Sequence, residues 1–96
     1  MTGGTAKPTW QTRVSDIKRR AAEARSLLDN AVFTAILSEI QEDAVAAFLR
    51  PTATPADLAT AHESVRAVET IKNAIQARLD AEAFADKKAD QHRGND

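Results

Sequence analysis

The sequence predicts an all-α protein: a long antiparallel helical hairpin that assembles into an oligomeric helical bundle or ring. Two observations carry this prediction. Glycine and proline, which break helices, are confined to the first eight residues, to Pro51 and Pro55, and to Gly94. Between these breakers, apolar residues recur with alternating spacings of three and four, the pattern of a helix with one buried face.

Composition limits the possible functions. A chain of 96 residues with a net charge of −1 is one domain at most, and this balance argues against a nucleic-acid coat protein or a polybasic membrane binder. It has no cysteine, so we expect neither a disulfide framework nor a thiolate metal site. Its longest wholly apolar run, 44–49, is far shorter than the about 20 residues of a membrane span, and no signal-peptide core is present. We therefore expect a protein without a membrane partner, in the cytoplasm or in a particle assembled there.

The first arm of the hairpin is predicted over 9–50. Residues 1–8 are small and polar and indicate a flexible N-terminal arm, and Thr9 is the expected cap of the helix that follows. The first half of this helical arm has a heptad seam consisting of Trp10, Val14, Ile17, Ala21, Ala24 and Leu28. After Asp29 and Asn30 the apolar stripe is wider and out of phase, so the arm is either one kinked helix or two helices.

A turn over 51–54 separates the two arms. Pro51 disfavours helical geometry at the preceding residue and so ends the first arm. Thr54 is the expected cap of the second arm, with Pro55 at the first helical position and Asp57 where an acidic side chain completes a capping box. The second arm is predicted over 55–88, and the polar segment 89–96 is expected to fray. Its inner face consists of Leu58, Ala61, Val65, Val68, Ile71, Ile75, Leu79 and Phe84.

An antiparallel fold about this turn brings opposite charges together, pairing Arg25 with Asp80, Arg20 with Asp86 and Lys88 with Asp16. A two-helix hairpin offers each helix one neighbour, and the apolar stripe at 32–48 is too wide for one neighbour to cover. We therefore expect a homo-oligomer. Its predicted interface consists of Trp10, Val32, Phe33, Ile36, Ile40 and Phe48.

Basic residues are concentrated at the start of the chain, where six basic and two acidic residues give 7–25 a net charge of +4. One hypothesis is a face that contacts DNA or RNA phosphates without sequence preference. Its contact residues would be Lys7, Arg13, Lys18 and Arg19. The other is a solvated face that forms ion pairs with the second arm, which accounts for Arg20 and Arg25 but leaves Lys18 and Arg19 free. No helix-turn-helix, RNA-binding aromatic motif or zinc-finger spacing accompanies these residues.

Acidic residues follow, since 29–43 contains four acidic residues and no basic one. Glu39 and Asp43 share a helix face, as carboxylates of a di-metal bundle do, but neither His62 nor His92 stands three residues after a glutamate. We therefore prefer a solvated acidic face or a docking surface for a basic partner, and keep di-metal storage as a third hypothesis. Without a nucleophile–base set or a phosphate-binding loop, we expect no catalytic activity, no cofactor and no bound metal.

One layout extends over residues 20–80. It consists of the run Ala24-Arg25-Ser26-Leu27-Leu28-Asp29-Asn30, an apolar helix, a Pro/Thr/Asp turn and a second helix with Arg66, Val68 and Glu69. This layout resembles the short helical proteins encoded beside the large terminase and portal genes of tailed bacteriophages and phage-like gene-transfer particles, some of which are small terminase subunits or minor head proteins.

The resemblance implies a non-catalytic oligomeric adaptor in phage DNA packaging or head assembly, which bridges DNA and the motor or portal. Its partners would be copies of itself, the large terminase or portal protein, and DNA bound non-specifically, in the host cytoplasm or in the virion. The chain departs from the fuller small-terminase plan because it lacks an N-terminal helix-turn-helix domain, which puts sequence-specific DNA recognition in doubt. The alternative is a structural or regulatory coiled-coil interaction protein with no nucleic-acid role.

Overall fold

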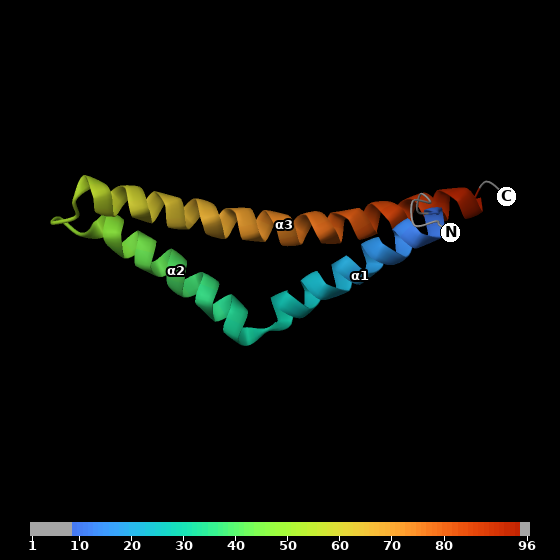
Figure 1. Ribbon diagram of the computed structural model, residues 1–96, viewed down its shortest axis with the longest axis horizontal. Coiled ribbons are helices and arrows are strands. Elements are labelled where there is room, and N and C mark those ends of the chain that lie inside the picture. Colours follow the sequence, from blue (N-terminus) through green and yellow to red (C-terminus); the bar gives the residue numbers. More distant parts are fainter. Residues whose placement is uncertain (1–8, 95–96) are drawn as a thin grey trace, which may run out of the picture.

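Three helices make up the chain: α1 (Trp10–Asp29), α2 (Ala31–Leu49) and α3 (Pro55–Gly94) (Figure 1). The computed structural model describes the backbone of residues 9–94 and the side chains of residues 9–91. Within this range no residue lies in a strand, so the all-helical prediction is confirmed. The predicted N-terminal arm at 1–8 and the last two residues lie outside the described part of the chain.

The first arm is two helices, and Asn30 is the residue that divides them. Its backbone is extended, with φ −81° and ψ 110°, and its N–H donates to the carbonyl of Leu27 at 3.1 Å. Its side-chain oxygen accepts the N–H of Phe33 at 3.0 Å, which caps α2. One residue thus ends α1 and starts α2, and the two helices meet at an angle there (Figure 1).

The predicted caps at the other two helix starts are confirmed. The Thr9 hydroxyl accepts the N–H of Thr12 at 3.2 Å, so α1 begins at Trp10. At α3, the Thr54 hydroxyl accepts the N–H of Asp57 at 3.1 Å, and the Asp57 carboxylate accepts the N–H of Thr54 at 3.0 Å. This reciprocal pair is a capping box, and it sets the start of α3 at Pro55.

The C-terminal end of α3 differs from the prediction. The second arm was expected to end at 88 and to fray over 89–96, but α3 continues to Gly94. The polar segment contains no proline, and its first glycine is Gly94 itself, so nothing in it breaks the helix. Within this extension Ala89 is half-buried.

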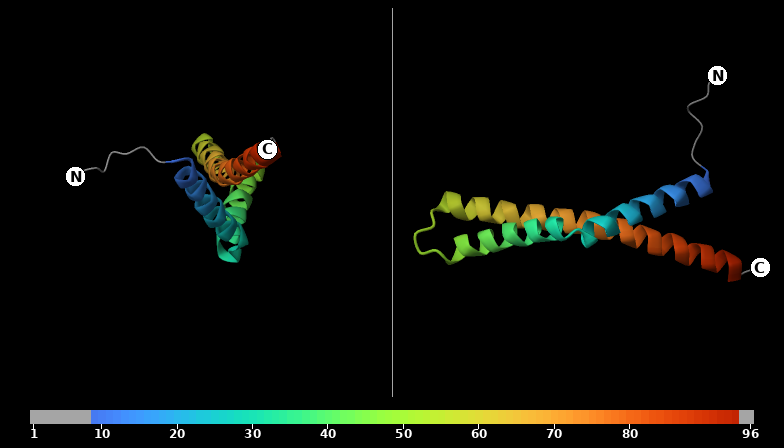
Figure 2. Two further views of the ribbon diagram at one scale, coloured as in Figure 1. Left: turned by 90° about the vertical axis from the view of Figure 1, so that its right-hand side faces the viewer. Right: turned by 90° about the horizontal axis from the view of Figure 1, so that it is seen from below.

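The chain reverses direction between α2 and α3, and α3 then runs past α2 and on past α1 (Figures 1 and 2). The side chains buried between the helices are mostly alanine: Ala21, Ala24, Leu37, Ala44, Ala47, Ala61, Val68, Ile75 and Ala85. Alanine lets helices approach closely but removes little apolar area from water. The radius of gyration is 20.2 Å, whereas a compact domain of this length has about 13 Å, so most side chains lie near the surface.

Two residues of the predicted inner face of α3 lie elsewhere. Ile71 is 39% exposed and Phe84 is 64% exposed, while Ala85 takes the buried position next to Phe84. Phe84 follows Leu79 by five residues, a spacing that moves it off the inner face of a helix with 3.6 residues per turn. Among the described residues, no helix is both long enough and apolar enough to cross a membrane.

Candidate interaction surface

Ion pairs neutralise most of the basic residues on α1. Arg19 donates to Asp16 and to Glu23, the latter at 3.2 Å, and Lys18 lies 3.8 Å from Asp86 on α3. The prediction that Lys18 and Arg19 are free is therefore wrong. The hydrogen bond to Asp16 raises the pKa of Arg19, and that same hydrogen bond lowers the pKa of Asp16.

The pairs across α1 and α3 also differ from the predicted ones. Arg25 donates to Glu82 at 2.6 Å and not to Asp80. Glu82 is the most shielded member of these pairs, with its side chain 19% exposed, and the hydrogen bond from Arg25 lowers its pKa below the ordinary range. Arg20 does not pair with Asp86, which forms an ion pair with Lys18 instead.

The third predicted pair, Lys88 with Asp16, is replaced by a contact of the Lys88 ammonium with the Phe84 ring, 5.7 Å from its centroid. The predicted pairs assumed that the whole first arm aligns with α3 as one straight helix. The break at Asn30 divides this arm, and α1 and α2 each pack on α3 as separate helices, so the alignment of one does not fix that of the other.

Two arginines of α1 remain. In the part of the chain with described side chains, neither Arg13 nor Arg20 forms an ion pair or a side-chain hydrogen bond. Of the four predicted nucleic-acid contacts, Arg13 is thus unpaired, Lys18 and Arg19 are engaged within the chain, and Lys7 lies outside the described residues.

The three acidic residues of α2, Glu39, Glu42 and Asp43, are exposed, and no ion pair joins them to another described residue. No group of three metal-ligating side chains lies together anywhere in the described range. His62 packs its ring edge-on against Phe48, 4.8 Å between centroids, and the side chain of His92 lies outside the described ones. The structure therefore offers no described cluster for the di-metal hypothesis.

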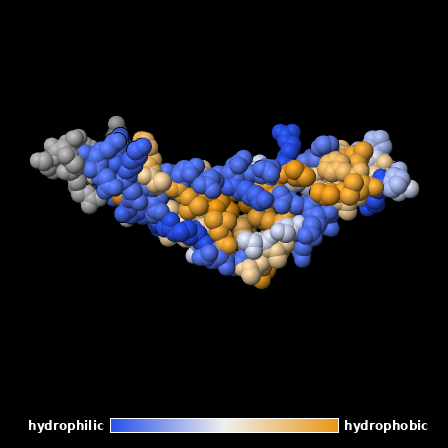
Figure 3. Space-filling model, turned by 180° about the vertical axis from the view of Figure 1, so that it is seen from behind, coloured by the Kyte–Doolittle hydropathy of each residue, from blue (hydrophilic) through white to orange (hydrophobic). Residues whose placement is uncertain are grey.

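Apolar side chains are exposed along the first two helices, and Figure 3 shows such surface around the bend and near the turn on one face of the molecule. Of the six predicted interface residues, Phe33 is half-buried and the other five are exposed. Phe48 is partly covered by the contact with His62 described above.

Sequence reasoning missed six exposed apolar residues: Leu27, Leu28, Val45, Leu49, Ile71 and Phe84. Of these, Leu28 was predicted in the heptad seam, and Ile71 and Phe84 on the inner face of the second arm. The signal for the two on α2 was present in the sequence, because Val45 and Leu49 lie off the stripe that faces α3 and extend the apolar surface of this helix beyond it. The exposure of Leu27 and Ile71 depends on where the helices cross, and the sequence pattern does not predict these crossing points.

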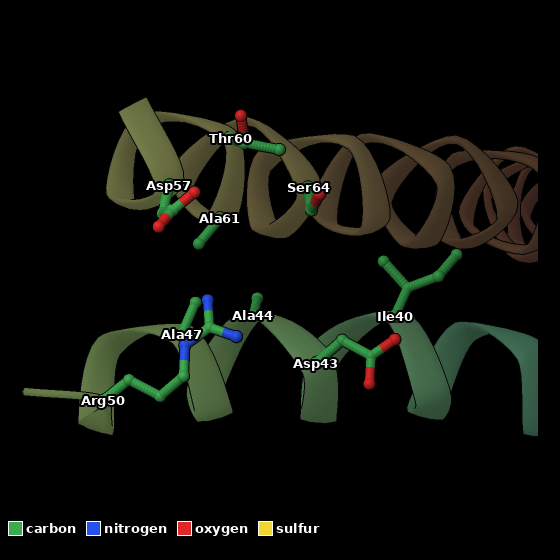
Figure 4. A pocket seen from close by; sticks show the side chains of 9 residues that line it. All are labelled: Ile40, Asp43, Ala44, Ala47, Arg50, Asp57, Thr60, Ala61 and Ser64. Carbon is green, nitrogen blue, oxygen red and sulfur yellow. The ribbon is translucent and has the colours of Figure 1, made fainter. Parts of the chain in front are cut away.

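A groove between α2 and α3 lies beside the turn (Figure 4). Its walls are small residues with polar ones at the rim: Ile40, Asp43, Ala44, Ala47, Arg50, Asp57, Thr60, Ala61 and Ser64. The capping hydrogen bonds from Thr54 lower the pKa of Asp57, and the nearby positive charge of Arg50 lowers it further. Two lining residues, Thr60 and Ser64, carry hydroxyl groups, and neither a histidine nor a cysteine is among the lining residues.

No known protein family, curated protein or solved structure matches this chain. The distinguishing feature of its surface is exposed apolar area on α2, which lies between basic residues on α1 and acidic residues on α2.

Proposed function

We propose that this chain is a non-catalytic adaptor whose three helices form a bent helical hairpin that assembles with copies of itself. One observation carries the proposal: α2 has large apolar side chains well beyond the one side that α3 covers. Val32 is 68% exposed and Leu49 is 77% exposed, on a helix with three charged residues. A helix of this composition is normally buried, and large exposed apolar patches mark interaction sites.

The thin core supports the same proposal. Six of the nine buried side chains are alanine, so the single chain removes little apolar area from water. Chains this small rarely reach useful stability on one thin core. Association would bury the outer side of α2 and add the apolar area that the single chain lacks.

Sedimentation at micromolar concentration tests the proposal, with a multimer as the expected result. Val32→Asp should dissociate it, because an unpaired charge would be placed in the interface. Ala59→Asp is the matched control, since Ala59 is exposed on α3. A folded, monodisperse wild-type monomer would overturn the proposal.

A narrower form of the proposal assigns the adaptor to phage DNA packaging or head assembly, and rests on the resemblance to the helical proteins of these gene modules. It is supported by unpaired Arg13 and Arg20 on α1, and not by Lys18 or Arg19 as first expected. DNA binding should then be weak, independent of sequence and steeply dependent on salt.

Retention of duplex DNA by the wild-type protein, measured from low to physiological salt, tests this narrower form. If no DNA is retained at low salt, the packaging role fails. The alternative, an interaction protein with no nucleic-acid role, then becomes the better hypothesis.

A further inference from the structure

Three stripes of residues adjoin on one side of the molecule. On α1, Arg13, Arg20 and Leu27 recur every seven residues and so share a side. A second stripe on one side of α2, with spacings of four, four and three, consists of Val32, Ile36, Ile40 and Asp43. On α3, Ser64, Ile71 and Arg78 again recur every seven residues.

Contacts with α3 place these stripes on the same side. Arg20 of α1 lines a hollow together with Arg78 of α3. Ile40 and Asp43 of α2 line the groove that contains Ser64 of α3 (Figure 4). Because Ser64 and Arg78 belong to one stripe, the residues from α1 and α2 border the same edge of α3. We call the surface of these three stripes the mixed-charge face.

The mixed-charge face changes in character along its length. Its α1 end is basic, with Arg13 and Arg20, and its α2 end is acidic, with Asp43 and the neighbouring Glu39. Its middle is apolar and exposed: Leu27, Val32, Ile36, Ile40 and Ile71. Arg13, Arg20, Glu39 and Asp43 make no ion pair with any other described side chain, whereas Arg78 of the α3 stripe lies 3.6 Å from Glu23 of α1.

Such a face is complementary to itself. A rotation of 180° about an axis through the bend exchanges the positions of α1 and α2. Since α1 runs towards the bend and α2 runs away from it, α1 of one copy would lie antiparallel to α2 of the other (Figure 1). A two-fold contact of this kind uses one patch twice, as most homodimer interfaces do.

The positions of the charges match this arrangement. Arg20 precedes Asn30 by ten residues, which is about 15 Å along α1 at about 1.5 Å per residue. Glu39 and Asp43 follow Asn30 by nine and thirteen residues, or about 14 and 20 Å along α2. The guanidinium of Arg20 would therefore lie between the two carboxylates of the opposite copy, with Arg13 beyond them.

We propose that a second copy of this chain docks on the mixed-charge face about a two-fold axis at Asn30, with the arginines of each α1 against the carboxylates of the opposite α2. This inference rests on the proposed self-association and specifies its geometry. It competes with the DNA-packaging form of the proposal, because Arg13 and Arg20 cannot contact phosphates while they pair with carboxylates of the second copy. The apolar middle supplies the driving force, and the end charges fix the orientation, because a parallel pairing would set like charges against each other.

Reciprocal charge reversal tests the geometry. Arg13→Glu/Arg20→Glu alone and Glu39→Lys/Asp43→Lys alone should each weaken self-association by roughly tenfold or more, since like charges would then face each other. An equimolar mixture of the two variants should restore wild-type affinity, because every contact in the mixed dimer joins opposite charges. Arg66→Glu with Glu69→Lys is the control, since both residues are exposed on α3 outside the mixed-charge face.

If wild type associates but the mixture does not, the proposed geometry is wrong and the self-association stands. If wild type is a monomer, the proposed function fails as well. Circular dichroism checks that each variant keeps its helices, which is expected because all four reversed residues are exposed.

Disulfide trapping gives a second, independent test because the chain contains no cysteine. Val32 lies two residues from the proposed axis, so Val32→Cys should form a linked homodimer under mild oxidation at low concentration. Leu49→Cys is equally accessible but lies far from the axis and should link much more slowly. Equal rates for the two variants would overturn the two-fold axis at the bend.

Discussion

Arg25 of α1 donates both of its terminal nitrogens to the two carboxylate oxygens of Glu82 of α3, at 2.6 and 3.2 Å. The two residues are 57 positions apart in the sequence, so this pair defines how α1 is placed along α3. A forked guanidinium–carboxylate contact is more directional than a lysine pair, which makes it a specific marker of that placement.

The first prediction concerns the acid stability that this pair provides. The folded protein lowers the pKa of Glu82 below its ordinary value of 4.5, so folding favours the ionised carboxylate. The contribution to stability is complete above the ordinary pKa and is lost as the pH falls through it towards the lower folded pKa. Glu82→Gln should therefore lower the melting temperature at neutral pH. The decrease in melting temperature between neutral pH and pH about 3 should then be smaller in this variant than in wild type.

Thermal unfolding over this pH range measures the effect. Asp80→Asn is the control, since Asp80 accepts only from Gln76 of the same helix, at 2.9 Å. If the melting temperatures of wild type and Glu82→Gln depended on pH in the same way, the Arg25–Glu82 pair would not be a source of the acid sensitivity.

The second prediction concerns the capping box of α3. Thr54→Ala removes the acceptor for the Asp57 N–H and should cost about 1 kcal/mol, which lowers the melting temperature of a domain of this size by about 4–8 °C. Thr54→Ser keeps a hydroxyl in the same place and should recover most of this loss. If serine is no better than alanine, the threonine acts through its methyl group and not as a cap.

The third prediction concerns the bend. Asn30→Ala removes the cap of α2 and supplies the best helix former, so it should lower stability by about 1 kcal/mol and favour a straighter first arm. Spin labels on Ser15→Cys and Glu42→Cys report the second effect, because these positions, 27 apart in the sequence, would be separated by about 40 Å along one continuous helix. A distance that does not lengthen would mean that packing on α3, and not Asn30, sets the bend.

The fourth prediction concerns the alanine contact between α1 and α3. Ala21 is 0% exposed, so Ala21→Leu must push the two helices apart and should cost about 1–3 kcal/mol. Ala22→Leu makes the same change at the neighbouring exposed position and should be close to neutral. Denaturant unfolding of the two variants measures the difference, and equal stabilities would show that the helices do not approach at Ala21.

Several local features could be read from the sequence because short-range chemistry decides them. Threonine before a helix accepts an N–H within the first turn whatever the rest of the chain does, so the caps at Thr9 and Thr54 were predictable. The break near Asn30 was also visible, but its outcome was not. Whether an asparagine bends a helix or divides it depends on the packing on either side.

Sequence alone thus determined the helical class, the starts of α1 and α3 and the excess of apolar residues on α2. Tertiary structure decided which charges meet: Arg19 with its own helix, Arg25 with Glu82, and Arg13 and Arg20 with no described side chain. The physical reason is the distance along the chain over which each interaction acts. Capping and helix propensity act within one turn, whereas ion pairs form over a few ångströms between elements whose offset is set by the bend and by the close contact of small residues such as Ala21.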